Sequence, residues 1–171
     1  MCGIVGYIGK KDIALKVLTD GLSALEYRGY DSAGVAYKFD NNVKIIKSLG
    51  KIENLKNELN NGEESNLGIG HTRWATHGKP STTNSHPHNV NKITIVHNGI
   101  IENYEEIKNE LKQQGYNFKS ETDTEVACAY IDYIYSKTKN MLETIKKCEE
   151  KFTGSYAFGI INEDELDRLY A

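Results

Sequence analysis

The sequence predicts a single domain of the α+β class. Strand-like patterns of small, branched and apolar residues predict strands over 2–8, 33–39, 43–48, 67–72, 93–97 and 155–161. Helices are predicted over 12–26, where apolar residues recur at helical spacing, and over 103–114, 122–135 and 140–151. The polar stretch 54–66, rich in Asn and Glu, is predicted to form a short helix and a loop. Strands and helices are mixed along the chain, and no repeat, low-complexity tract or linker divides it. The 171 residues are enough for one domain with a real core.

Polar residues at the right spacing mark the ends of two predicted helices. Asn103 and Glu106 predict an N-terminal cap pair for the first, and Gly115 predicts its end. Thr122 and Glu125 predict a capping box at the start of the second.

The sequence also makes specific predictions for two connecting segments and for the end of the chain. Asn98-Gly99, a strong turn signal, is expected to close the strand over 93–97. The stretch 73–91 has no clear period and contains both prolines, so it is predicted to be a long loop, a kind of segment that is often functional. The chain stops shortly after its last predicted strand, which suggests a fold that is incomplete at the C-terminus.

Composition excludes several classes of protein. Hydrophobic residues make up 39% and charged residues 26% of the chain, which is typical of a globular protein rather than a disordered one. A net charge of −3 argues against a nucleic-acid partner. Three widely spaced cysteines argue against a disulfide framework. No apolar run could span a bilayer and no secretory signal is evident, so a cytoplasmic protein without a membrane partner is expected.

Cys2 is the first candidate for chemistry. A small second residue permits removal of Met1, which would leave Cys2 with both a thiol and a free α-amine. An α-amine titrates near neutral pH and can accept the thiol proton, directly or through one water. The alternative is that Cys2 is a small apolar strand residue, and its position alone favours that interpretation.

Two other segments offer groups for an acyl-transfer site. The Asn98 side chain and the Gly99 backbone N–H could stabilise a developing oxyanion, although Asn-Gly is more often a plain tight turn. Asp123 could bind an ammonium group. Acidic residues in the first turn of a helix, however, are also explained by the helix dipole.

The loop over 71–78 offers groups for binding a small ligand. Arg73 could clamp a carboxylate with two parallel hydrogen bonds, and Trp74 could cap the pocket. Thr76 and His77 offer polar contacts. A surface loop with an anchoring tryptophan is the alternative.

The histidines do not indicate a metal. All five fall within 27 positions, but they form no helical i, i+4 pair and no zinc-ligand pattern. No metal and no other cofactor is therefore predicted. The five are His71, His77, His86, His88 and His97.

Six segments together carry a family resemblance. They are Met1–Gly6, Tyr27–Gly34, His71–Gly78, His86–His88, Val96–Asn103 and Ser120–Glu125. In this order they resemble the glutaminase domain of the glutamine–fructose-6-phosphate aminotransferase (isomerizing) family, which belongs to the class II glutamine amidotransferases. Amidophosphoribosyltransferases and asparagine synthetases share the Cys-Gly start but differ in the loops. The resemblance covers essentially the whole chain.

The resemblance implies a fold and a set of roles. The fold would be the N-terminal-nucleophile hydrolase sandwich, with four layers in the order αββα. Cys2 would attack the side-chain amide of L-glutamine and form a thioester, with the oxyanion bound by Asn98 and Gly99. Arg73 would bind the α-carboxylate of glutamine and Asp123 its α-ammonium.

The resemblance also implies a lid and further domains. Residues 73–81 would form a lid that closes over glutamine, with Trp74 as its hinged aromatic, and Thr76 and His77 would line the pocket. Residues 2–171 would form a truncated glutaminase domain, and C-terminal sugar-isomerase domains absent here would use the ammonia to convert fructose 6-phosphate to glucosamine 6-phosphate. The full-length protein would be a homodimer. The alternatives are a non-catalytic glutamine-binding module and another amidotransferase branch with a different ammonia acceptor.

Overall fold

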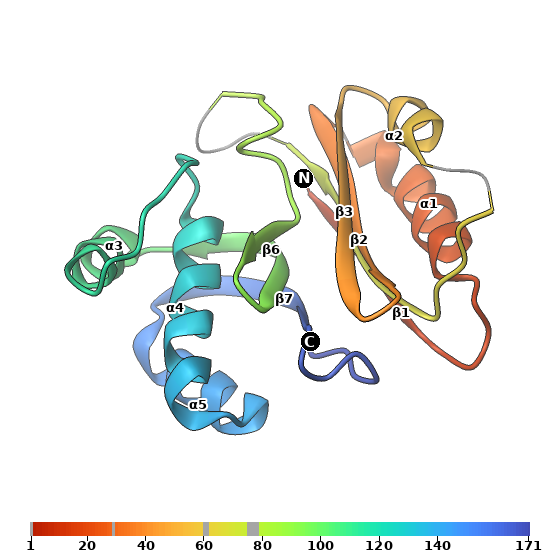
Figure 1. Ribbon diagram of the computed structural model, residues 1–171. Coiled ribbons are helices and arrows are strands. Elements are labelled where there is room, and N and C mark those ends of the chain that lie inside the picture. The colour runs from red at the N-terminus through yellow and green to blue at the C-terminus, as the bar shows by residue number, and fades with distance from the viewer. Residues whose placement is uncertain (1, 29, 60–61, 75–78) are drawn as a thin grey trace.

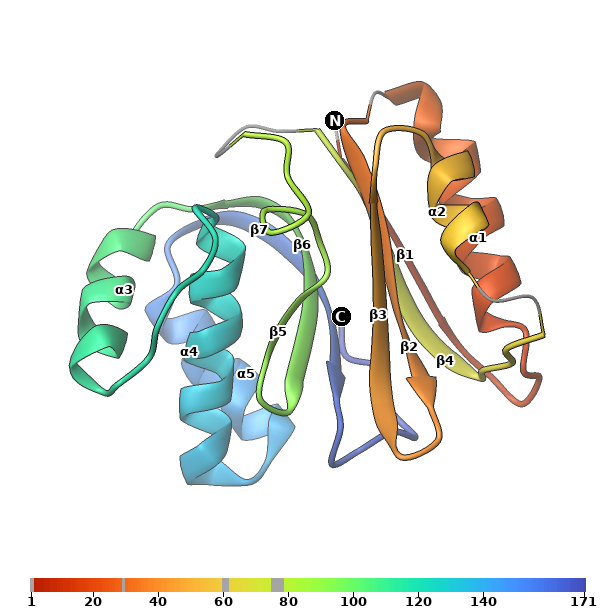
Figure 2. The ribbon, with the colours of Figure 1, turned by 45° about the horizontal axis from the view of Figure 1, so that its top comes forward.

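The protein consists of two antiparallel sheets that lie face to face between two layers of helices (Figures 1 and 2). The computed structural model describes residues 2–28, 30–59, 62–74 and 79–171. The first sheet has the order β1-β4-β2-β3, and the second has the order β5-β6-β7. The strands are β1 (Gly3–Ile8), β2 (Ser32–Phe39), β3 (Asn42–Leu49), β4 (Leu67–Arg73), β5 (His88–Val90), β6 (Ile93–Ile101) and β7 (Gly154–Asn162).

Helices cover the outer face of each sheet (Figure 2). The first sheet is covered by α1 (Ala14–Leu25) and α2 (Ile52–Glu58), and a 3₁₀ turn, Glu26–Arg28, follows α1. The second sheet is covered by α3 (Tyr104–Gln113), α4 (Asp123–Thr138) and α5 (Met141–Lys151). No helix in the described part of the chain is long and apolar enough to cross a membrane. The α+β class and the αββα layering expected from the sequence are both confirmed.

Apolar clusters fill each of the three interfaces between layers. One joins α1 and α2 to the first sheet and includes Leu18, Leu22 and Leu55. A second lies between the sheets, where Ile69 of β4 and Val96 of β6 are fully buried. The third and largest joins the second sheet to α3, α4 and α5. Burial of these side chains against both faces of each sheet fixes the distance between the sheets, and so the shape of any site at their edge.

The expected turn at Asn98-Gly99 is wrong, because β6 continues through both residues. Its antiparallel register with β7 runs without a break from Ile93 opposite Asn162 to Ile101 opposite Gly154. A partner strand far along the chain supplies the pairing, and a local turn signal contains no information about it. The predicted loop over 73–91 likewise contains a short strand, β5, which pairs with β6.

The expected cap pair at the start of α3 is also wrong. Asn103 stands at the N-cap, but its side chain makes no cap hydrogen bond. Its carboxamide instead accepts from the Thr153 N–H at 3.1 Å and donates to the Lys151 carbonyl at 2.9 Å. Glu106 forms an ion pair with the Lys151 ammonium at 2.9 Å. Contacts with the end of α5 therefore replace the local cap.

Half of the capping box at the start of α4 is confirmed. Thr122 Oγ1 accepts a hydrogen bond from the Glu125 N–H at 3.3 Å. The Glu125 carboxylate does not return the bond to Thr122. It accepts from the backbone N–H groups of Lys119 and Ser120 instead, at 3.0 and 2.6 Å. These bonds hold the segment that leads into the first turn of α4, where Asp123 stands.

Candidate active site

The pairing of β1 with β4 places Cys2 beside the end of β4. Gly3 lies opposite Thr72, and the Gly3 N–H donates to Thr72 Oγ1 at 3.1 Å. The Cys2 sulfur therefore lies against the backbone of Trp74. Cys2 Sγ accepts from the Trp74 N–H at 3.2 Å and lies 3.6 Å from the Trp74 carbonyl oxygen.

Asn98 reaches Cys2 from the second sheet. Its Nδ2 donates to the Cys2 carbonyl oxygen, with 3.3 Å between the two atoms. Its Oδ1 lies 2.9 Å from His71 Nε2 on β4. Gly99, the next residue of β6, lines the same pocket as Cys2. The two residues expected to bind an oxyanion thus lie next to the expected nucleophile.

Gly99 can only be glycine in this backbone. Its φ is +118°, and a Cβ atom there would lie 2.0 Å from the Ser155 carbonyl oxygen of β7. Gly99→Ala is expected to lower the free energy of unfolding by about 3 kcal/mol or more, because backbone of β7 would have to move. Urea denaturation measures this change.

Gly115→Ala is the matched control for that substitution. Gly115 also has a positive φ, +90°, but nothing lies within 4 Å of its Cβ position. This variant should show only the cost of the left-handed backbone, about 1–2 kcal/mol. Equal losses for the two variants would mean that the close approach of β7 to Gly99 does not constrain the site.

Arg73 is buried at the end of β4 and lines the pocket. Its Nη1 forms an ion pair with Asp31 Oδ1 at 3.6 Å, and its carbonyl accepts from the Asp31 N–H at 2.7 Å. The Ser32 hydroxyl donates to Asp31 Oδ1 at 2.8 Å. The segment that leads into β2 therefore holds the guanidinium through both backbone and side chain.

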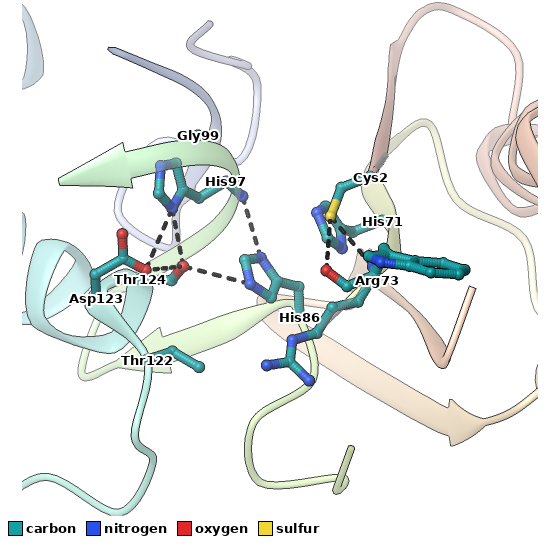
Figure 3. Close-up of a pocket in the computed structure, with 10 residues that line it drawn as sticks. Cys2, His71, Arg73, His86, His97, Gly99, Thr122, Asp123 and Thr124 are labelled. Carbon is teal, nitrogen blue, oxygen red and sulfur yellow. Dashed lines mark hydrogen bonds and ion pairs between the residues drawn. The ribbon is translucent and has the colours of Figure 1, made fainter. Parts of the chain in front are cut away.

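Asp123 lies across the pocket from Cys2, at the first position of α4 (Figure 3). Its Oδ2 accepts from the Ile101 N–H of β6 at 2.9 Å. Its Oδ1 lies 3.5 Å from Thr124 Oγ1 and 3.9 Å from His97 Nδ1. Asp123 therefore joins the start of α4 to the second sheet. A favourable interaction with the helix dipole is not the only structural reason for an acidic residue at this position.

The expected lid is described only at its ends. Trp74 lines the pocket, and its side chain is 52% exposed. Thr76 and His77 lie outside the described residues, so their predicted contacts with the ligand stay predictions. After the gap, Asn84 holds the loop by donating to the Lys79 carbonyl at 3.0 Å and to Glu121 Oε2 at 3.2 Å.

Four buried histidines form a wall beside the site: His71, His86 and His97 line the pocket, and His88 packs edge-on against His86. The rings of His71 and His86 are stacked, with centroids 4.1 Å apart and planes 13° apart. His86 Nδ1 accepts from the His97 N–H at 3.2 Å, and its Nε2 lies 3.3 Å from Thr124 Oγ1. His97 Nδ1 lies 2.9 Å from the same hydroxyl. Burial lowers the pKa of His71 to about 4, and it lowers the pKa of His86, His88 and His97 as well.

The histidine wall does not form a metal site. Among the described residues, no group of three or more His, Cys, Asp or Glu side chains could hold a metal ion. Ring nitrogens of all four histidines instead contact hydroxyls, an amide or a backbone N–H. Within the described part of the chain, His71 Nδ1 and His97 Nε2 have no hydrogen-bond partner. This arrangement suits neutral imidazoles that position other groups.

Comparison with known proteins decides the family. The sequence family described as a glutamine amidotransferase domain matches residues 71–171. A protein of Clostridium perfringens named glutamine–fructose-6-phosphate aminotransferase [isomerizing] is 54% identical over 100% of this chain. A Pyrococcus horikoshii protein of the same name is 48% identical over 99% of it. This chain belongs to the glutamine amidotransferase domain family. It spans 28% of the length of the Clostridium protein and 29% of the Pyrococcus protein.

Solved structures in the comparison share the fold. The glutamine phosphoribosylpyrophosphate amidotransferase from B. subtilis, solved with ADP and GMP, superposes with a TM-score of 0.80 and 28% identity. It matches 95% of this chain and 35% of that protein. A class II glutamine aminotransferase domain protein from Silicibacter pomeroyi superposes with a TM-score of 0.55 at 12% identity, which shows the fold alone. The family's N-terminal-nucleophile hydrolase sandwich, expected from the sequence, is thereby confirmed.

Sequence reasoning did not single out several residues that the fold brings to the site of this family member. Asp31 holds Arg73, although its segment, Tyr27–Gly34, was noted only as part of the resemblance. Thr124 joins two histidines to Asp123. His71 contacts Asn98. The crowding of five histidines within 27 positions was the signal available in the sequence, but such crowding does not by itself predict contacts with Asn98 or Thr124.

Proposed function

We propose that this chain hydrolyses L-glutamine to glutamate and ammonia, with Cys2 as the nucleophile. One observation carries the proposal: the Cys2 thiol shares a single pocket with Arg73 and Asp123. A buried arginine and a buried carboxylate are the two groups needed to hold the α-carboxylate and the α-ammonium of an amino acid. The geometry supports glutamine binding with its side-chain amide toward Cys2.

The reaction would proceed through a thioester. Once Met1 has been removed, the Cys2 α-amine takes the thiol proton and the sulfur attacks the amide carbon of the glutamine side chain. Asn98 Nδ2 and the Gly99 N–H bind the oxyanion. The C–N bond then breaks, and the proton on the amine passes to the leaving nitrogen, which departs as ammonia. Water attacks the thioester next, its proton returns to sulfur through the amine, and glutamate is released.

The use of the ammonia is a further part of the proposal. The relatives' name supports transfer to fructose 6-phosphate, giving glucosamine 6-phosphate, in sugar-isomerase domains that would lie outside the 28–29% of the relatives that this chain matches. The division into a glutaminase domain and those domains stays a prediction. A homodimeric full-length protein, a cytoplasmic location and the absence of a nucleic-acid partner stay predictions as well.

The proposed substrate is tested by comparing L-glutamine with its α-amide. The chain should release equal amounts of glutamate and ammonia from L-glutamine. The α-amide lacks the carboxylate that Arg73 would bind, and its kcat/KM should be about 10²-fold lower, as loss of a charged hydrogen-bonded pair implies. Arg73→Gln should lower kcat/KM for glutamine by a similar factor and remove the discrimination.

Arg168→Gln is the control, because Arg168 is an exposed cation outside the pocket. It should leave both rates unchanged. Calorimetry that detects glutamine binding without ammonia release would contradict the proposal and favour the non-catalytic binding module.

A further inference from the structure

The contact between His71 and Asn98 joins the two sheets at the site. His71 is fully buried on β4, and its Nε2 lies 2.9 Å from Asn98 Oδ1 on β6. The other end of the Asn98 carboxamide, Nδ2, points to the Cys2 carbonyl at 3.3 Å. The carboxamide is therefore held at both ends, with its oxygen away from Cys2 and its nitrogen toward it.

The chemistry of the contact defines the state of the imidazole. A carboxamide oxygen can only accept a hydrogen bond, so His71 Nε2 carries the hydrogen and donates it. Burial lowers the pKa of His71 to about 4, so at neutral pH the ring has a single hydrogen, which lies on Nε2. The stack with His86 fixes the plane of the ring, and His86 is itself held by the His97 N–H.

The orientation of the carboxamide matters for the reaction. An Asn side chain can turn by 180° about its last bond, which exchanges its oxygen and its NH₂ group. Only the NH₂ group can stabilise an oxyanion beside Cys2, and an oxygen in its place would repel the negative charge. A donor that binds Asn98 Oδ1 from the far side excludes the unproductive orientation.

We propose that His71 is a positioning residue that fixes the Asn98 carboxamide with Nδ2 toward the reacting carbon. The inference rests on the proposed function, because it assigns Asn98 to the oxyanion. His71 acts through Asn98 and does not exchange a proton with the substrate.

Two substitutions of His71 distinguish the effect of losing the hydrogen-bond donor from the effect of losing the ring. His71→Leu removes the donor, and His71→Gln keeps an N–H donor near the place of Nε2. We expect His71→Leu to lower kcat for glutamine hydrolysis by about 10- to 100-fold with little change in KM, the range typical of groups that orient a functional side chain. His71→Gln should recover most of the loss. An unchanged kcat in His71→Leu, or a loss that appears only in KM, would overturn the proposal.

A double-mutant cycle tests whether His71 acts through Asn98. In an Asn98→Ala background, His71→Leu should lower kcat by less than about 3-fold, because the group that it positions is already gone. If the loss of kcat in the double variant equals the product of the losses in the two single variants, His71 acts independently of Asn98 and the proposal is overturned.

Nuclear magnetic resonance gives a readout that does not need activity. The side-chain NH₂ signals of Asn98, assigned by their loss in Asn98→Ala, should show a nuclear Overhauser contact to the Cys2 Hα proton in the unmodified chain and in His71→Gln. His71→Leu should lose that contact. Retention of the contact in folded His71→Leu would overturn the positioning role. Absence of glutamine hydrolysis in the unmodified chain would overturn only the proposed function.

Discussion

Cys2→Ala is expected to lower the rate of glutamate and ammonia release by at least about 10³-fold, because it removes the group that forms the thioester. The same substitution should leave the free energy of unfolding nearly unchanged, since the Cys2 side chain is only partly buried and precedes β1. Steady-state kinetics and urea denaturation measure the two effects. Activity that survives in Cys2→Ala would contradict the proposed mechanism.

The other two cysteines provide the control. Cys128 and Cys148 are buried, and burial raises the pKa of both thiols, to about 12 for Cys148. They should stay protonated and unreactive at neutral pH. Iodoacetamide should therefore inactivate the chain as one cysteine is modified, and peptide mass spectrometry should identify that cysteine as Cys2. Cys148→Ala should keep the glutaminase activity.

The role of the α-amine is tested by the same assay. A variant with extra residues before Cys2 keeps the thiol and its contact with Trp74 but has no free amine at Cys2. It should lose activity to a similar extent as Cys2→Ala while still reacting with iodoacetamide. Full activity of the extended chain would show that another group accepts the thiol proton.

The elements of the fold were predictable where their signal is local. The apolar positions of α1 and α5 recur at helical spacing, and the observed helices begin and end within two residues of the predicted limits. Strand β6 was misjudged at its end because pairing with β7, not the Asn98-Gly99 dipeptide, determines where it stops. The prediction of a cap pair at the start of α3 was wrong for a similar reason, because Asn103 forms hydrogen bonds with Thr153 and Lys151, which are distant in the sequence.

The residues of the candidate site could be named from the resemblance, but the contacts between them could not. Cys2, Gly99, Arg73 and Asp123 were each named from short motifs, and the fold brings them to one pocket. The bond between His71 and Asn98 depends on how closely two sheets approach each other, a distance set by the apolar clusters between the layers. No motif carries that information.

Mild acid is expected to destabilise the fold strongly through its buried histidines. Burial holds the pKa of His71 at about 4, and it holds the pKa of His86 and His88 well below the usual value of about 6.5. His97 is shifted in the same direction, although the nearby Asp123 opposes its shift. The folded chain therefore keeps these rings neutral at a pH where the unfolded chain binds protons.

The sign and size of the effect follow from proton linkage. Below about pH 6.5 the unfolded state binds more protons than the folded state, so the free energy of unfolding falls as pH falls, down to the folded pKa values. At pH 5.5 each strongly shifted histidine costs about 1.4 kcal/mol. His71, His86 and His88 together cost about 4 kcal/mol, a large fraction of the stability of a typical domain.

Urea denaturation at pH 7.5 and 5.5 measures this loss of stability. Most carboxylates titrate below this pH range, so they contribute little to the difference. His88→Gln is the informative variant, because a glutamine amide can still bond to the Thr122 hydroxyl that His88 Nε2 contacts at 3.1 Å, yet it cannot titrate. Its loss of stability between the two pH values should be smaller than that of the unmodified chain by about 1.4 kcal/mol. An unmodified chain equally stable at both pH values would mean that these rings accept protons without unfolding. The neutral His71 that donates to Asn98 would then have to be reconsidered as well, since both conclusions rest on the same burial between the sheets.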